Sequence, residues 1–252
     1  MEPALSETPI IALGNWLDSA PGRYVRAWEQ QCLDTLTADI FGFNAMQIGL
    51  PQIDALQANR MPNRWLTDTA VSANTSGAIA VTHDLAELPF ASQSLDLVVL
   101  PHVLEFAAHP HQVLREVERV LIPEGRLIIC GFNPASLWGV RQITGRLSKN
   151  PYLPLEGEFI SMPRLKDWLK LLSFEVSHGD FGCYAPACRS DRSLQRFAFL
   201  EKAGANWWPF LGAVYVVQAI KRVRGMHLVG PALARKSIGA TSALPVTNKF
   251  TK

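Results

Sequence analysis

The sequence has no long uninterrupted apolar segment. Its longest strongly apolar run, residues 207–220, contains Pro209 and Gln218 and is shorter than the ~20 apolar residues that a membrane-spanning helix needs. The first residues also lack a basic stretch followed by an apolar core and a cleavage site, so a secretory signal is not expected. We therefore predict a cytoplasmic protein without a membrane span.

Cysteine and charged residues are both scarce. The 252 residues include four cysteines, and charged residues make up 18% of the chain against 48% hydrophobic residues. A chain of this length buries a large core without disulfide or metal support, and its composition differs from that of disordered proteins. In a reducing compartment we expect the four thiols to be core residues or free thiols.

Spacings typical of metal sites and nicotinamide sites are also missing. His109 and His111 flank an expected helix start without a third ligand nearby, and Cys183, Cys188 and His178 follow no standard zinc spacing. No Gly-x-Gly-x-x-Gly motif follows the first predicted strand, which argues against a nicotinamide-dependent dehydrogenase. We predict that the protein binds no metal.

The apolar residues follow the periods of alternating helices and strands. The predicted strands are 43–49, 64–67, 78–82, 95–100, 126–131, one that starts at 174, and 213–220. The predicted helices are 22–38, a weak one ending near 58, 110–121, 162–172 and 190–203. Such alternation indicates one α/β domain with a mostly parallel sheet. We place it at residues 20–222, after an irregular lead-in at 1–19 and before a basic tail at 223–252 that we expect to be disordered.

The central part of the chain resembles a known family. The resemblance is carried by three runs, which read LPFASQSLDLVV at 88–99, VLE at 103–105 and LREVERVLIPEGRL at 114–127. These runs resemble the class I S-adenosylmethionine-dependent methyltransferases of the type-11-like group, most densely over residues 84–131. The resemblance implies a Rossmann-like, seven-stranded α/β fold whose sheet is mostly parallel with an antiparallel last strand. It also implies S-adenosylmethionine as the cofactor.

The resemblance further implies a cofactor site at the carboxyl ends of the strands. In the family, an acidic residue shortly before Leu-Pro-Phe hydrogen-bonds the adenine amino group, and the matching pair here is Asp84 and Leu85. The family residues that follow the fourth strand face the methionine part of the cofactor. Here those residues are Leu100, Pro101 and His102.

The turn after the first strand departs from the family pattern. The family has an acidic residue and a glycine-rich turn there, whereas residues 47–52 read QIGLPQ, with one glycine and no carboxylate. Asp68 lies 19 residues beyond Gly49, close to the ~20-residue spacing at which a carboxylate meets ribose hydroxyls. We include Gln47, Gly49 and Asp68 in the predicted cofactor site.

Methyl transfer from a sulfonium requires mainly that the protein position the reactants and exclude water. His102 is the candidate general base if the acceptor must lose a proton, and Trp138 is a candidate for stacking on the acceptor. The acceptor stays unidentified. The absence of an Asn/Asp-Pro-Pro-Tyr/Phe motif argues against adenine or glutamine, and a small molecule is favoured.

The altered first turn leaves open a second interpretation, a degenerate methyltransferase fold that serves as an interaction or regulatory module.

Charge and aromatic residues are unevenly distributed. Residues 221–252 hold seven of the 24 basic residues and none of the 22 acidic ones, so the preceding part carries a net charge of about −5. Nucleic-acid binding is therefore not expected, except through the tail.

The run WWPF at 207–210 is either an exposed patch for a partner or membrane surface or, as we favour, a cover for the sheet edge.

Overall fold

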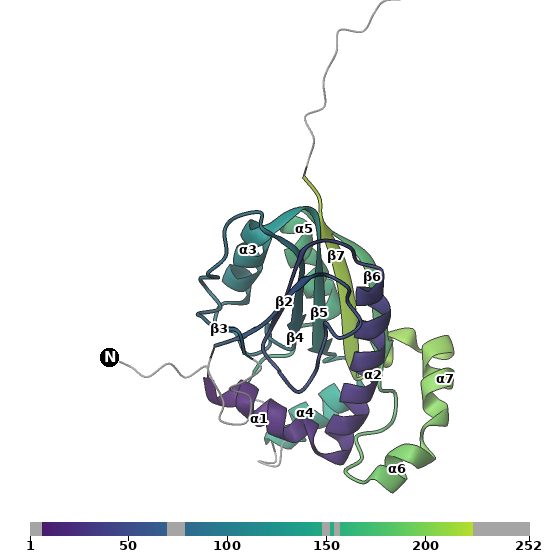
Figure 1. Cartoon of the computed structure of the whole chain (residues 1–252). Coiled ribbons are helices and arrows are strands. Elements are labelled where there is room, and N and C mark those ends of the chain that lie inside the picture. The colour runs from purple at the N-terminus through teal and green to yellow at the C-terminus, as the bar shows by residue number, and fades with distance from the viewer. Residues whose placement is uncertain (1–6, 70–78, 148–151, 154–156, 224–252) are drawn as a thin grey trace, which may run out of the picture.

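Seven strands form one mixed sheet in the computed structural model of the protein (Figure 1), which describes residues 7–69, 79–147, 152–153 and 157–223. The strand order across the sheet is β3-β2-β1-β4-β5-β7-β6. The strands are β1 (Asn44–Ile48), β2 (Asn63–Asp68), β3 (Val81–Thr82), β4 (Leu95–Pro101), β5 (Leu121–Phe132), β6 (Phe174–Gly182) and β7 (Val214–Lys221). The helices are α1 (Glu7–Leu17), α2 (Ala20–Ala38), α3 (Pro110–Val120), α4 (Leu137–Leu147), α5 (Met162–Leu171), α6 (Asp191–Arg196), α7 (Phe199–Trp207) and the short 3-10 helix η1 (Pro209–Leu211).

The strand directions match the fold implied by the sequence. β1 pairs in parallel with β2 and β4, β2 with β3, and β4 with β5. β7 lies between β5 and β6 and runs antiparallel to both. The prediction of a seven-stranded, mostly parallel sheet with an antiparallel last strand is therefore confirmed.

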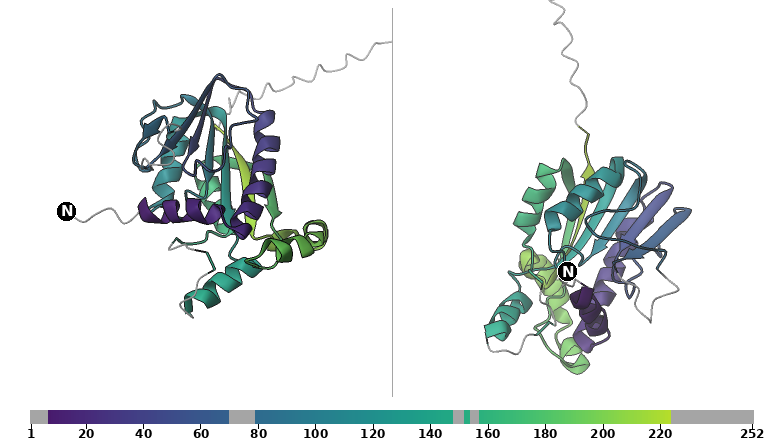
Figure 2. Two further views of the ribbon diagram at one scale, coloured as in Figure 1. Left: turned by 60° about the horizontal axis from the view of Figure 1, so that its bottom comes forward. Right: turned by 90° about the vertical axis from the view of Figure 1, so that its left-hand side faces the viewer.

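Helices cover both faces of the sheet (Figure 2). On one face, Leu13 of α1 and Leu33 of α2 are fully buried in a core shared with the sheet. On the other face, Val117 of α3 and Leu165 of α5 are fully buried in a second core. β4 is buried on both sides, which agrees with the uninterrupted apolar run at 97–100.

Two of these helices begin at the edge of the sheet where the parallel strands end. Ser19 caps α2, since its hydroxyl accepts a hydrogen bond from the amide of Gly22, and Pro21 lies in the first turn. α3 begins at Pro110, a residue suited to the first helical position because its missing amide proton would have no partner there. The proline residues thus fix where each helix departs from this edge, which we call the carboxyl edge.

The structure differs from the predicted elements in several places. Residues 137–147, where no helix was predicted, form α4. Residues 7–17, expected to be irregular, form α1, because Leu13 and Leu17 are buried against the rest of the core. The weak helix expected near residues 50–58 is instead a series of turns. The helix expected at 190–203 is two helices, α6 and α7. The turn expected at 123–125 lies within β5, whose pairing with β4 is irregular between Leu95 and Leu97.

Parts of two further predictions lie outside the described residues. Of the tail predicted at 223–252, the structure describes only Val223, and of the strand predicted at 78–82 it describes 79–82. Within the described part of the chain, no helix combines the length and the apolar character that crossing a membrane requires.

Candidate active site at the carboxyl edge

The carboxyl ends of β1, β2 and β3 meet through backbone hydrogen bonds. The amide of Gly49, directly after β1, donates to the carbonyl of Thr67 at 2.7 Å. The amide of His83, directly after β3, donates to the carbonyl of Asp68 at 3.1 Å. The residues that follow these three strands, which the sequence predicts to line the cofactor, are therefore neighbours at one edge of the sheet.

Gln47 organises the turn after β1. Its side chain is buried, and its Nε2 donates to the carbonyls of Gly49 (3.1 Å), Leu50 (3.2 Å) and Ile53 (2.7 Å). Its Oε1 accepts a hydrogen bond from the amide of Ala55 at 2.9 Å. A carboxylate could not donate to the three carbonyls, so the replacement of the family's acidic residue by glutamine suits this loop.

Gly49 has a backbone conformation that a side chain would strain. Its φ is +73°, and a Cβ atom built there would lie 3.4 Å from Cγ2 of Val103. Leu50 also has a positive φ, 45°. The turn is therefore tightly folded and packed against the segment that follows β4.

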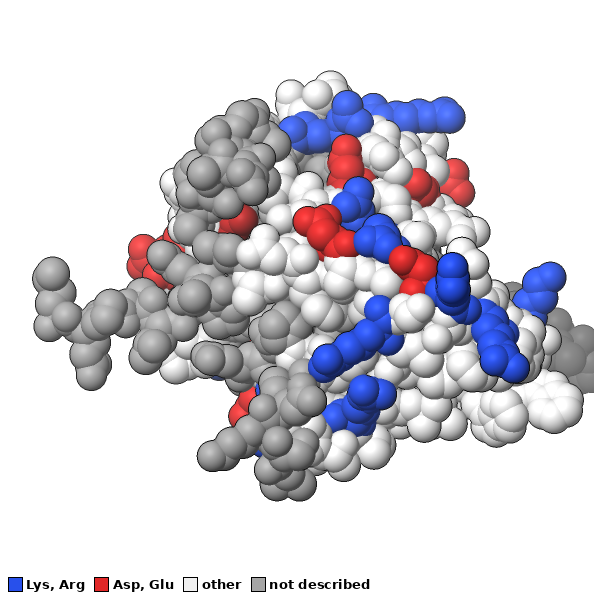
Figure 3. All heavy atoms as spheres, turned by 90° about the horizontal axis from the view of Figure 1, so that it is seen from below, with Lys and Arg blue, Asp and Glu red and all other residues white. Residues whose placement is uncertain are grey.

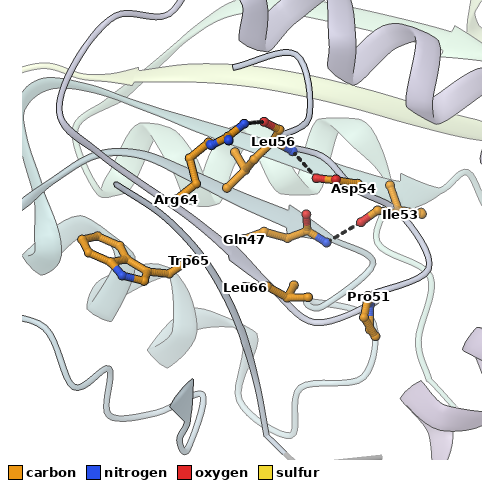
Figure 4. Close-up of a pocket in the computed structure, with 8 residues that line it drawn as sticks. All are labelled: Gln47, Pro51, Ile53, Asp54, Leu56, Arg64, Trp65 and Leu66. Carbon is orange, nitrogen blue, oxygen red and sulfur yellow. Dashed lines mark hydrogen bonds between the residues drawn. The ribbon is translucent and has the colours of Figure 1, made fainter. Parts of the chain in front are cut away.

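A cavity of about 330 Å³ lies on the flank of this turn (Figure 4). It occupies the space between the 51–56 loop and β2, next to the residues where a helix was expected. Arg64 donates from Nη1 to the carbonyl of Leu56 at 3.0 Å, and Gln47 forms part of the wall. The residues that line it are Gln47, Pro51, Ile53, Asp54, Leu56, Arg64, Trp65 and Leu66. Arg64 was not among the predicted site residues.

The predicted nucleoside-binding carboxylates lie at the ends of β2 and β3. Asp68 is half-buried, and its Oδ1 accepts a hydrogen bond from the amide of Thr69 at 2.7 Å. Asp84 is exposed, and its Oδ1 accepts from the amide of Ala86 at 2.9 Å. Leu85 is buried beside it. Both carboxylates are thus held by local backbone amides at adjacent strand ends.

Leu100 and Pro101, predicted to face the cofactor, are buried at the end of β4. Leu100 has no exposed surface and belongs to the core under α3 and α5. Pro101 pairs with Cys130 of β5. Their side chains are packed within the sheet.

His102 is fixed between two carboxylates. Its Nε2 lies 2.8 Å from Oε1 of Glu29, and its Nδ1 lies 2.8 Å from Oε2 of Glu105. Oε1 of Glu105 also accepts a hydrogen bond from the amide of Phe132 at 2.6 Å, and the rings of His102 and Phe132 are 4.4 Å apart. All three side chains of this His102 cluster, which we define as Glu29, His102 and Glu105, are buried.

The cluster favours a protonated imidazole. Burial lowers the pKa of His102, but the charges of Glu29 and Glu105 and the hydrogen bonds to them outweigh burial and raise this pKa to about 10. Burial raises the pKa of Glu105, against the opposing effect of the hydrogen bond from His102. Because both ring nitrogens of a protonated His102 donate to carboxylates, neither one is available in this arrangement to accept a proton from a methyl acceptor.

Glu29 was missed by the sequence analysis, although the sequence contains a signal for it. Val25, Glu29 and Leu33 are four residues apart, so they lie on one stripe of α2, and all three are buried. A carboxylate on an otherwise apolar stripe requires a buried partner. His102 is that partner.

Trp138 also differs from its expected placement. It lies in α4 with 1% of its surface exposed, and its Nε1 donates to the carbonyl of Ala185 at 2.7 Å. Its ring packs edge-on against Trp16 and Tyr152. Trp138 is therefore a core residue, and the expectation that it stacks on the acceptor is not supported.

Among the described residues, no group of three or more histidine, cysteine, aspartate or glutamate side chains could hold a metal ion. The ring of His111 instead packs 4.1 Å from that of Trp168.

Comparison with known proteins identifies the family. A family model described as a methyltransferase domain matches residues 54–129. The uncharacterized protein YafS of Escherichia coli (strain K12) is 34% identical over 179 residues, which cover 71% of this chain and 72% of YafS. The chain belongs to the class I S-adenosylmethionine-dependent methyltransferase family. The match to the family begins at residue 54, after the altered turn.

Solved structures share the fold of this methyltransferase-family chain. A chain from the complex between the Haloferax volcanii Trm112 methyltransferase activator and a methyltransferase aligns with a TM-score of 0.61 and 14% identity, over 87% of this chain and 100% of that chain. A methyltransferase from Thermotoga maritima aligns with a TM-score of 0.59 and 16% identity, over 82% and 93% of the two chains. One from Archaeoglobus fulgidus aligns with a TM-score of 0.55 and 16% identity, over 78% and 94%.

The residues at the carboxyl edge fit the two halves of the family's cofactor to different degrees. Asp68 and Asp84 offer carboxylate oxygens at adjacent strand ends, which are suitable acceptors for ribose hydroxyls and an adenine amino group. Both carboxylates also accept hydrogen bonds from neighbouring amides, but a carboxylate can accept several hydrogen bonds, whereas the single N–H of Gly49 and the side-chain amide of Gln47 donate within the turn after β1. The residues of this methyltransferase-family chain therefore fit the nucleoside half of S-adenosylmethionine better than its methionine half.

Proposed function

We propose that the protein is an S-adenosylmethionine-dependent methyltransferase that anchors its cofactor chiefly by the nucleoside half. The observation that carries this proposal is the pair of carboxylates Asp68 and Asp84 at adjacent strand ends, where the main-chain amide of His83 donates to the main-chain carbonyl of Asp68. Asp84 would accept from the adenine amino group and Asp68 from the ribose. Family membership supports the choice of cofactor.

The remaining predicted residues would hold the backbone of the strand ends and of the turn after β1 in place. Leu85 and Leu100 are buried, and they would fix the backbone at the ends of β3 and β4. Gln47 would hold the turn after β1, and Gly49 would allow its close approach to β2. Pro101 would end β4 where the cofactor's methionine part is expected.

When bound, S-adenosylmethionine supplies an electrophilic sulfonium methyl group, so the chain's own residues need mainly to orient the acceptor and exclude water. We assign His102 a positioning role, in which it joins β4 to α2, rather than the role of general base. The described cluster holds its proton firmly. This assignment favours an acceptor whose attacking atom needs no protein base, and we favour a small molecule.

A non-catalytic role is the second candidate, and one observation favours it. The turn after β1 uses the Gly49 amide and the Gln47 side chain internally and packs against Val103. If this turn does not admit the methionine half, the domain would serve as an interaction module. Cofactor binding separates the two candidates.

The test compares binding of S-adenosylmethionine and S-adenosylhomocysteine to three variants by thermal shift and calorimetry. We expect Asp84→Asn and Asp68→Asn each to weaken binding by roughly 10-fold or more, since a hydrogen bond to a charged group contributes about 1.5–3 kcal/mol. Asp167→Asn, an exposed position on α5, is the matched control and should bind like the parent. Parent-like binding by both site variants would refute the assigned residues, and no binding by the parent would favour the non-catalytic role.

A further inference from the structure

Four short helices form one cap at the carboxyl edge (Figure 2). We define this edge cap as residues 133–147 and 183–213, which include α4, α6, α7 and η1. Arg141 of α4 donates from Nη1 to the carbonyl of Ala187 at 2.8 Å, and the side chain of Asn133 donates to the carbonyls of Phe210 and Gly212. These hydrogen bonds join the segment after β5 to the segment between β6 and β7.

The outer surface of the edge cap is unusually apolar. In α4, the side chains of Leu137, Val140 and Ile143 are spaced three residues apart, and each is more than half exposed. In α7 and η1, Trp207 is 75% exposed and Phe210 is 72% exposed. The other exposed large apolar residues of the cap are Phe199, Trp208 and Leu211. The expectation that the WWPF run covers the sheet edge is thus wrong for most of its aromatic surface.

The inner surface of the same helices explains why these side chains point outward. Trp138 and Gln142 of α4 are buried, so the opposite stripe of this helix faces solvent. In α7, Gly204 packs directly under the ring of Tyr184, whereas Trp207 at the end of the helix is exposed. Clusters of exposed apolar residues of this kind mark binding surfaces more often than scattered single residues do.

Basic side chains accompany the apolar surface. Arg192 and Arg196 are one turn apart on α6, both are exposed, and neither has an ion-pair partner among the described residues. The acidic residues nearby are engaged elsewhere, because Asp191 pairs with Arg23 and Glu201 accepts from the amide of Tyr184. Viewed from this end of the molecule, lysine and arginine side chains lie among broad uncharged areas, and acidic side chains lie beside several of them (Figure 3).

We propose that the edge cap docks on the surface of an anionic lipid membrane. Tryptophan prefers the boundary between headgroups and acyl chains, because its ring is large and apolar while its N–H remains hydrated. Leu137, Val140 and Ile143 would enter the same boundary, and Arg192 and Arg196 would pair with lipid phosphates. The helices of the cap are too short to span a bilayer, so the contact is peripheral.

The proposal goes beyond methyl transfer and does not depend on it. It would place the carboxyl edge, where the proposed cofactor site lies, next to the membrane. The binding test below uses no cofactor and no acceptor, so its failure would leave the proposed function untouched.

The test is flotation of the full chain with vesicles of phosphatidylglycerol and phosphatidylcholine in equal amounts, and with vesicles of phosphatidylcholine alone. We expect flotation with the anionic vesicles and at least 10-fold weaker partitioning onto the neutral ones. Trp207→Ser combined with Trp208→Ser should lower partitioning at least 10-fold, and Arg192→Gln combined with Arg196→Gln should remove the preference for anionic lipid. Leu171→Ser is the matched control, because Leu171 is 82% exposed on α5, outside the cap.

Three results would overturn the proposal. One is that the parent does not float with anionic vesicles. Another is that both pairs of substitutions leave flotation unchanged, which would assign lipid binding to another part of the chain. The third is that gel filtration shows a dimer that the Trp207→Ser and Trp208→Ser pair converts to a monomer, since a second copy would then cover the surface. Because all substituted side chains are exposed, the variants should keep the parent's melting temperature, which is checked in parallel.

Discussion

The Nε2 atom of His102 lies 2.8 Å from Oε1 of Glu29, although 73 residues separate the two in the sequence. This contact joins the end of β4 to the middle of α2. Neither side chain is exposed, and Oε2 of Glu29 is buried without a hydrogen-bond partner among the described residues. The stability of the domain should therefore depend on the proton that His102 holds.

We expect the free energy of unfolding to fall as pH rises from about 6.5 to about 10. The pKa of His102 rises from 6.5 to about 10 on folding, so its stabilising effect is complete below the lower value and is lost as pH passes the higher one. The raised pKa of Glu105 has the same sign, and its contribution to stability starts to be lost at a lower pH, above its ordinary value of 4.5. Urea unfolding at several pH values measures this slope.

The variant His102→Gln tests whether the cluster causes the slope. Removing the cation leaves two buried carboxylates, and breaking a buried pair in this way costs about 3–5 kcal/mol. The variant should be destabilised most at pH 6.5, and its stability should depend less on pH than that of the parent. An unchanged slope would mean that other groups produce it.

A substitution at Gln47 tests the role of the loop after β1. Gln47→Glu restores the family's acidic residue but places oxygen atoms against the carbonyls of Gly49, Leu50 and Ile53. Because an unsatisfied buried polar group costs about 1–3 kcal/mol, we expect a loss of at least ~2 kcal/mol in urea unfolding. Gln112→Glu, at an exposed position on α3, is the control. A variant as stable as the parent would show that the loop does not need these bonds.

Alanine substitutions at Gly49 and Gly179 test whether the backbone conformation of Gly49 requires a glycine. Gly49→Ala should lower stability by about 1–2 kcal/mol, since an L-residue at φ +73° is strained and its Cβ meets Val103. Gly179→Ala places a Cβ 3.8 Å from Met162 without a positive φ, and it should have little effect. Thermal unfolding of the two variants measures the difference. Equal effects would argue against strain at Gly49.

Trp138 should matter for stability and not for ligand binding. Replacing this buried indole by Ala should cost about 3–5 kcal/mol, because it leaves a large cavity between α1 and α4 and frees the carbonyl of Ala185. The affinity for S-adenosylhomocysteine, measured below the variant's melting temperature, should stay within about twofold of the parent. A loss of affinity without a loss of stability would instead support a place in the acceptor site.

The order of helices and strands was predictable because each core element carries its own period. The run 97–100 is apolar throughout and lies in the doubly buried β4, and the apolar stripe that starts at residue 113 becomes the inner face of α3. α1 was not predictable in this way, because its place depends on Trp16 packing against Phe132, a contact across 116 positions of chain. The loop at 50–58 likewise depends on the bonds of Gln47 rather than on local propensity.

The candidate site was predictable only in part. The strand-end positions of Gly49, Asp68 and Asp84 followed from strand order and the family resemblance. The environment of His102 could not be predicted in this way, because its two carboxylate partners come from α2 and from the segment after β4. Sequence position placed this histidine at the carboxyl edge, and the packing of other elements determined that it is enclosed.

Calorimetric titration of the parent with S-adenosylhomocysteine tests the central claim most directly, because this product retains the nucleoside half and needs no acceptor. We predict saturable heat with one site per chain, reduced by Asp84→Asn and unaffected by Asp167→Asn. No heat and no rise in melting temperature at millimolar ligand would contradict the proposal that this methyltransferase fold binds its family's cofactor.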